Sequence, residues 1–149
     1  MKKRILLIST ILLVSLEGIL AQAPAVVPID WPVLAQVRYK SFQTPGMVEG
    51  EKPEPGMAVQ RLNGEEVRIR GYVIPLDVEG TNFLLSAQPN ESCFFCGKAG
   101  IETVAELWLA DGHRHFKMDE IVTFRGTLLL NYESDGLLYL LKDAKEVRD

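Results

Sequence analysis

The chain has 149 residues, of which 47% are hydrophobic, and a formal net charge of −4, which suits one domain with a substantial core. Its acidic balance disfavours binding to nucleic acid or to an anionic membrane. Both cysteines lie in one short stretch, and no acid/base pair, nucleophile triad or phosphate-binding loop competes with it.

The N-terminus matches a secretory signal peptide at residues 1–21. A basic segment at residues 2–4 precedes an apolar run, and Ala21 is the best cleavage position. Cleavage removes three positive charges and one negative charge, which leaves about 128 residues with a net charge of −6. Polar residues interrupt the run, so a membrane anchor is the weaker reading. We expect a periplasmic or secreted protein with no membrane span after signal cleavage.

Residues 22–61 are expected to form a helix followed by a loop. Asp30 is a typical N-cap, and Pro32 suits the first helical turn, so a short helix should begin here. Its apolar stripe is expected to dock on the main body. From residue 41 to 57, proline and glycine recur and leave neither helical nor strand periodicity, which predicts a surface loop.

Residues 62–149 are expected to form a β-barrel. Alternating or apolar runs predict strands at residues 67–74, 82–87, 103–109, 121–131 and 139–147. The two longest strands contain Gly71 and Gly126, and mid-strand glycine is typical of the bends that a small barrel needs.

We therefore expect an all-β fold, a small five-stranded barrel of the oligonucleotide/oligosaccharide-binding (OB) type with a short N-terminal helix. A two-sheet β-sandwich is the alternative. OB folds usually have a helix between the third and fourth strands. Only residues 111–120 are available for it here, so we expect a loop or a single turn.

The candidate site is the stretch Ser92-Cys93-Phe94-Phe95-Cys96-Gly97. Cysteines with this spacing in an exported chain allow a structural disulfide, a thiol–disulfide exchange site, half of a metal site, or two inert thiols. So short a disulfide loop adds little chain-entropy stabilisation, which makes a purely structural bridge less persuasive. In exchange, Cys93 would be the attacking thiolate, and Lys98 is the nearby cation.

A zinc site would require His113 and His115, the only histidines in the chain. Sixteen residues separate Cys96 from His113, and the four side chains together have the right chemistry for zinc. A solvated loop is the simpler reading of the two histidines. The expected cofactor is therefore none, or zinc bound by Cys93, Cys96, His113 and His115.

Phe94 and Phe95, with Gly97, support the cysteine motif. Each phenylalanine carries a large apolar surface that is costly to leave in water. We expect one of them to pack against the barrel and shield the sulfurs. A partner-binding knob is the alternative.

The order of these motifs resembles a group of uncharacterised exported bacterial proteins related to the domain-of-unknown-function family 3299. The resemblance spans roughly residues 31–147 and rests on residues 62–76 and 83–86, on the cysteine motif and on the Lys98-Ala99-Gly100 that follows it. It implies a periplasmic location and a transporter or metal-homeostasis context, and it implies no reaction. The family pattern has one cysteine followed by histidine, so only Cys93 corresponds to it.

The sequence predicts an exported binding or accessory module of unknown ligand, with a structural disulfide or a metal site at its cysteines. The alternative is a thiol–disulfide exchange protein that uses Cys93 and Cys96. An enzyme is not favoured, because no positioned base or nucleophile beyond the thiols is visible. The expected partner is an envelope transporter or another periplasmic protein, and nucleic acid is not expected.

Overall fold

The computed structural model describes residues 25–42, 50–132 and 136–148. The predicted signal peptide lies outside these residues. In the described part of the chain, no helix has the length and apolar character needed to cross a membrane. The elements are β1 (Val27–Pro28), α2 (Trp31–Leu34), β2 (Val37–Phe42), β3 (Gly50–Pro55), α3 (Met57–Gln60), β4 (Glu66–Pro75), β5 (Phe83–Ser86), the 3₁₀ turns η2 (Asn90–Ser92), η3 (Phe94–Cys96) and η4 (Ile101–Thr103), β6 (Val104–Leu109), β7 (Glu120–Leu130) and β8 (Tyr139–Glu146).

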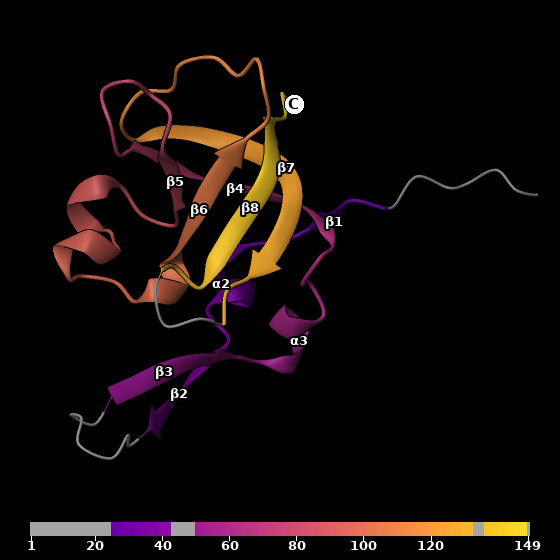
Figure 1. Cartoon of the computed structure of the whole chain (residues 1–149), viewed down its shortest axis with the longest axis vertical. Coiled ribbons are helices and arrows are strands. Elements are labelled where there is room, and N and C mark those ends of the chain that lie inside the picture. The colour runs from indigo at the N-terminus through magenta and orange to yellow at the C-terminus, as the bar shows by residue number, and fades with distance from the viewer. Residues whose placement is uncertain (1–24, 43–49, 133–135, 149) are drawn as a thin grey trace, which may run out of the picture.

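Five of these strands close into a barrel (Figure 1). Their order is β4-β5-β6-β8-β7, and β7 pairs back onto β4. The pairing of β6 with β8 is parallel, whereas the other four pairings in the barrel are antiparallel. This closure confirms the predicted five-stranded OB-like barrel rather than the sandwich.

The long strands alternate between core and surface as their sequences predict. In β4, Val67, Ile69 and Val73 are buried in the core together with the backbone of Gly71, and Arg68, Arg70 and Tyr72 alternate with them on the outer face. In β7 the pairing with β8 shifts at Gly126, where an added Cβ would lie 2.7 Å from the carbonyl oxygen of Lys142. The glycine therefore allows two backbones to approach closely at a bend.

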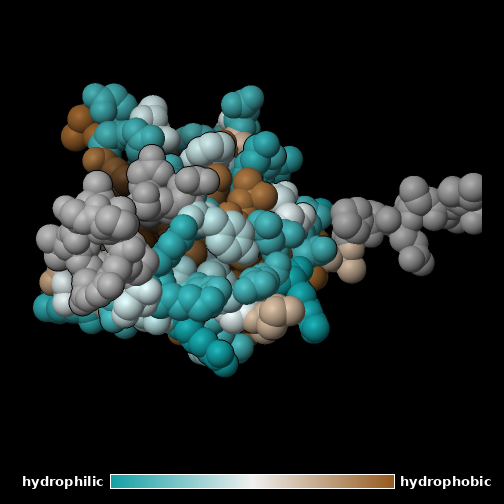
Figure 2. All heavy atoms as spheres, turned by 60° about the horizontal axis from the view of Figure 1, so that its bottom comes forward, coloured by the Kyte–Doolittle hydropathy of each residue, from teal (hydrophilic) through white to brown (hydrophobic). Residues whose placement is uncertain are grey.

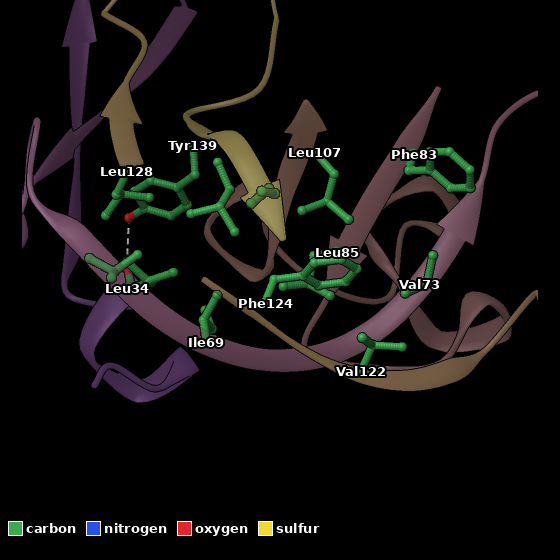
Figure 3. Packing of buried hydrophobic residues seen from close by; sticks show 14 of the residues in the cluster. Leu34, Ile69, Val73, Phe83, Leu85, Leu107, Val122, Phe124, Leu128 and Tyr139 are labelled. Atoms are coloured by element: carbon green, nitrogen blue, oxygen red, sulfur yellow. Dashed lines mark hydrogen bonds between the residues drawn. The ribbon is translucent and has the colours of Figure 1, made fainter. Parts of the chain in front are cut away.

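The short helix α2 covers one end of the barrel. Asp30 caps it, because its carboxylate accepts a hydrogen bond from the Val33 amide at 3.1 Å. Leu34 is fully buried, and the Tyr139 hydroxyl donates to its carbonyl oxygen at 2.6 Å (Figure 3). The connection at residues 110–119 is a loop, as expected. OB folds usually have a helix at this connection, and here the N-terminal helix α2 covers the end of the barrel instead.

The region predicted as a surface loop contains a β-hairpin arm, which corrects that prediction. Strands β2 and β3 pair from Val37 opposite Pro55 to Phe42 opposite Gly50. Figure 1 shows this arm extending away from the barrel. Two prolines in β3 are compatible with pairing because a two-stranded sheet needs backbone donors on only one side of each strand. Proline content alone therefore misled the assignment.

The face shown in Figure 2 is mostly hydrophilic, with small separate hydrophobic areas among the charged side chains. Among the described residues, the large hydrophobic side chains with the highest exposure are Val78 at 99%, Met57 at 66% and Phe95 at 58%. Phe95 belongs to the cysteine motif, so its exposure bears directly on the candidate site.

Candidate functional site

The cysteine motif lies in a segment, residues 87–103, that covers the outside of the barrel between β5 and β6 (Figure 1). Ile74 of β4 and Leu84 of β5 are paired neighbours on the outer face. They form a second apolar cluster with Cys93 and Val104. Because these outward residues are apolar, the barrel requires a cover at this position, and residues 87–103 supply it.

Hydrogen bonds fix both ends of this segment. At its start, the Asn90 amide donates to the Asp119 carboxylate at 2.7 Å, and the Asp119 amide donates to the Val73 carbonyl oxygen at 2.9 Å. At its end, the Ala87 amide donates to the Thr103 carbonyl oxygen at 2.9 Å. The segment is therefore tied to β4 and closed at its base.

The hairpin arm also reaches the segment. The Tyr39 hydroxyl of β2 donates to the Glu102 carboxylate of η4 at 2.7 Å. Burial and this hydrogen bond to a carboxylate raise the pKa of Tyr39 to about 12. The N-terminal region and the cysteine segment are therefore in direct contact.

One tight turn brings Cys93 and Cys96 together. Cys93 is the N-cap of η3, the Cys96 amide donates to the Cys93 carbonyl oxygen at 3.1 Å, and Gly97 ends the turn at φ 67°. Residues at the two ends of a four-residue turn have Cα atoms less than about 7 Å apart. A disulfide needs a separation of about 4.4–6.8 Å. The backbone geometry is therefore compatible with a bridge.

Asn90 contacts both cysteines, which sequence reasoning missed. The Cys96 thiol lies 3.2 Å from the Asn90 carbonyl oxygen, and the Cys93 amide donates to the same oxygen at 3.3 Å. The Cys93 sulfur lies 3.9 Å from Oδ1 of the Asn90 side chain. One residue therefore holds the Cys96 sulfur against the backbone of Cys93. The spacing of three residues between Asn90 and Cys93 was the available signal, because it is the spacing of a turn.

The two thiols differ sharply in exposure. Cys93 is 0% exposed and belongs to the second apolar cluster, whereas Cys96 is exposed, and both are free thiols. The sequence predicts Cys93 as the attacking thiolate in exchange. Burial places it away from any reagent, because attack requires access as well as thiolate character. The accessible sulfur belongs to Cys96.

The two phenylalanines divide as expected. Phe94 is partly buried and packs against the cluster that contains Cys93. Phe95 is 58% exposed, and its ring lies edge-to-face with that of Phe94 at 5.3 Å between centroids. One phenylalanine thus shields the buried sulfur, and the other is presented to solvent beside Cys96.

Of the two histidines, His113 contacts aromatic residues of the barrel. His113 packs edge-to-face on Phe83 at 5.7 Å between ring centroids, and its Nδ1 lies 3.0 Å from the Arg114 carbonyl oxygen. His115 is exposed and lies beside Gly80. The described residues contain no group of three or more histidine, cysteine or acidic side chains that could hold a metal ion. The four predicted zinc ligands are therefore not assembled, because the histidine loop packs on the core aromatics.

Arg114 fixes the loop that carries these histidines. Its guanidinium donates to the Glu120 carboxylate at 2.6 Å and to the Glu146 carboxylate at 2.9 Å, and it lies 4.3 Å from the centre of the Phe116 ring. Hydrogen bonds from Arg114 hold the pKa of both carboxyls below their usual range. A cavity of about 260 Å³ beside this clamp has no cysteine in its lining. The clamp is a structural feature apart from the thiols.

Fold and site together define an OB-like barrel whose outer β5–β6 face is covered by a dithiol segment. The structure resembles the crystal structure of a DUF3299 family protein from Pseudomonas aeruginosa, with a TM-score of 0.52 and 15% sequence identity. The alignment covers 86% of this chain and 99% of that one. The resemblance expected from the sequence is thereby confirmed at the level of the fold. No protein-family model matches the sequence, and no curated protein matches it.

Proposed function

We propose that the protein is an exported periplasmic accessory domain in which Cys93 and Cys96 form a dithiol–disulfide couple that exchanges with a partner. The observation that carries the proposal is the turn at η3, which faces both sulfurs toward Asn90 and exposes one of them. A pair held in this way can be oxidised with little backbone movement.

The alternatives have less support. Structural zinc normally takes four ligands, and the described residues offer no group of three. A purely structural bridge across two intervening residues adds little chain-entropy stabilisation, and the exposure of Cys96 leaves its sulfur open to attack. Exchange uses both the short spacing and the accessible thiol.

The export part of the proposal rests on the N-terminal pattern of basic and apolar residues ending at Ala21. In the bacterial periplasm, thiol pairs are kept under oxidising conditions. The partner we expect is another periplasmic protein or an envelope transporter, because the resemblance to the DUF3299 group implies that context.

A redox titration tests the proposal. The mature chain is purified without chelators, its free thiols and zinc are measured, and it is then equilibrated in glutathione buffers. A double variant, Cys93→Ser with Cys96→Ser, serves as the control. We expect a potential between roughly −270 and −120 mV, the range of exchange proteins. A potential well below about −300 mV indicates a structural bridge and contradicts the proposal. One equivalent of zinc bound through the thiols contradicts it in favour of a metal site.

A further inference from the structure

The geometry points to different roles for the two thiols: Cys96 attacks the disulfide of a substrate, and Cys93 then resolves the mixed disulfide. This inference rests on the proposed function. It assigns the two roles in the order opposite to that expected from sequence.

Accessibility separates the two roles. A substrate disulfide must approach the attacking sulfur from solvent, in line with its own sulfur–sulfur bond, and Cys96 is the exposed thiol. Cys93 is 0% exposed in the apolar cluster with Ile74 and Leu84, and Phe94 packs against this cluster. An external disulfide therefore cannot reach Cys93 while the segment stays on the barrel.

The turn makes the second step local. Cys96 lies three residues after Cys93 across η3, and the Cys96 thiol lies 3.2 Å from the carbonyl oxygen that also accepts the Cys93 amide. The buried sulfur thus has one accessible reaction partner, the sulfur of its neighbour. A resolving cysteine needs this combination, because protection from solvent prevents a second external attack.

The chemistry balances as a two-electron exchange. The Cys96 thiol gives its proton to solvent, and the thiolate attacks one sulfur of the substrate disulfide. The substrate sulfur–sulfur bond breaks, the mixed disulfide forms, and the first substrate thiolate leaves and takes up a proton. The Cys93 thiol then loses its proton, and its thiolate attacks the Cys96 sulfur. The Cys93–Cys96 bond forms, the mixed disulfide bond breaks, and the second substrate thiolate leaves and takes up the proton. The protein dithiol is oxidised and the substrate disulfide is reduced.

Competitive alkylation of the reduced wild-type chain tests the assignment without any substitution. The native protein is treated with substoichiometric iodoacetamide, and the labelled peptides are quantified by mass spectrometry. We expect Cys96 to be labelled roughly tenfold faster than Cys93 or more, because access limits the rate. Equal labelling, or faster labelling of Cys93, overturns the assignment.

Trapping provides the second test. Reduced Cys93→Ser and Cys96→Ser variants are each mixed with glutathione disulfide, or with a peptide disulfide that has apolar residues next to its cysteine. We expect Cys93→Ser to accumulate a stable mixed disulfide at Cys96, and Cys96→Ser to remain unmodified. A mixed disulfide on Cys96→Ser at an equal rate overturns the inference. A faster reaction with glutathione disulfide supports a small-molecule substrate, and a faster reaction with the peptide supports a protein substrate.

The outcomes separate this inference from the proposed function. Circular dichroism shows whether each variant folds, and the wild-type alkylation decides the roles if Cys93→Ser does not. If the titration gives an exchange-range potential but Cys93 is the labelled and trapped residue, the proposed function stands and the assignment fails. If the wild-type pair forms no disulfide in any buffer, both fail.

Discussion

Replacement of Leu34 by alanine tests whether the N-terminal turn α2 is part of the barrel core. Leu34 is 0% exposed and belongs to the same apolar cluster as Ile69, Phe124 and Tyr139 (Figure 3). Truncation of a fully buried leucine removes its transfer free energy and leaves a cavity, which together cost about 2–5 kcal/mol. Because domains are stable by only about 5–15 kcal/mol, the variant should lose a large share of its free energy of unfolding.

Urea unfolding followed by tryptophan fluorescence measures this effect. Trp31 reports on the docking of α2, because its indole nitrogen donates to the Arg70 carbonyl oxygen at 2.8 Å. We expect a lower midpoint with an unchanged m-value. Gln36→Ala is the matched control, since this exposed residue follows α2 and its loss should cost no more than about 0.5 kcal/mol. A loss below about 1 kcal/mol for Leu34→Ala would refute the reasoning.

Two further substitutions test the bend in β7 and an acid-sensitive loop. Gly126→Ala should lower stability by about 1–3 kcal/mol or more, because its new Cβ would lie 2.7 Å from a backbone oxygen; an unchanged melting temperature contradicts this. Hydrogen bonds from Thr81 and Asn82 lower the pKa of Asp77 from 3.8 to about 2. The stabilisation from this carboxylate is therefore complete above about pH 4 and is lost as the pH falls through about 2. Asp77→Asn should flatten the fall of unfolding free energy across that range, and equal slopes for variant and wild type would count against the assignment.

Sequence periodicity predicted the barrel well because each strand carries its own signal. The segment predicted at residues 67–74 forms β4 at Glu66–Pro75, and the segment predicted at residues 121–131 forms β7 at Glu120–Leu130. Two-residue alternation depends only on which face is buried, and here one face of each long strand fills the barrel interior. The mid-strand glycine of β7 was likewise a local signal for a bend.

The hairpin arm was not predictable on the same basis. Its strand β3, Gly50–Pro55, contains two prolines that normally indicate a turn or loop. The pairing with β2 is decided by which side of β3 faces its neighbour, and this is a property of two segments together. Composition within one segment cannot report it.

The sequence located the two cysteines of the candidate site but could not indicate their exposure. The spacing of Cys93 and Cys96 is visible in the sequence, whereas their exposure depends on what lies beneath the turn. Ile74 and Leu84 place apolar side chains on the outer face of the barrel. Cys93 is buried because it packs against them, which removes apolar surface from water. The contacts of Asn90 depend on the same docking. Burial of one thiol is therefore a tertiary effect that a local motif cannot encode.

The position of the segment explains why an OB-like barrel can serve as a scaffold for thiols. OB folds generally bind ligands on the face of their second and third strands, which correspond here to β5 and β6. In this protein, residues 87–103 cover that face, and Cys93 is part of the apolar layer between cover and barrel. To form a disulfide, the Cys96 sulfur would therefore have to move to the Cys93 sulfur, which packing already holds in place. Movement falls on the exposed half of the turn, while the contacts of Cys93 with Ile74, Leu84 and Val104 remain. The packing of Cys93 against the barrel thus fixes the buried sulfur, and under the proposed exchange the exposed Cys96 would be the sulfur that meets a substrate.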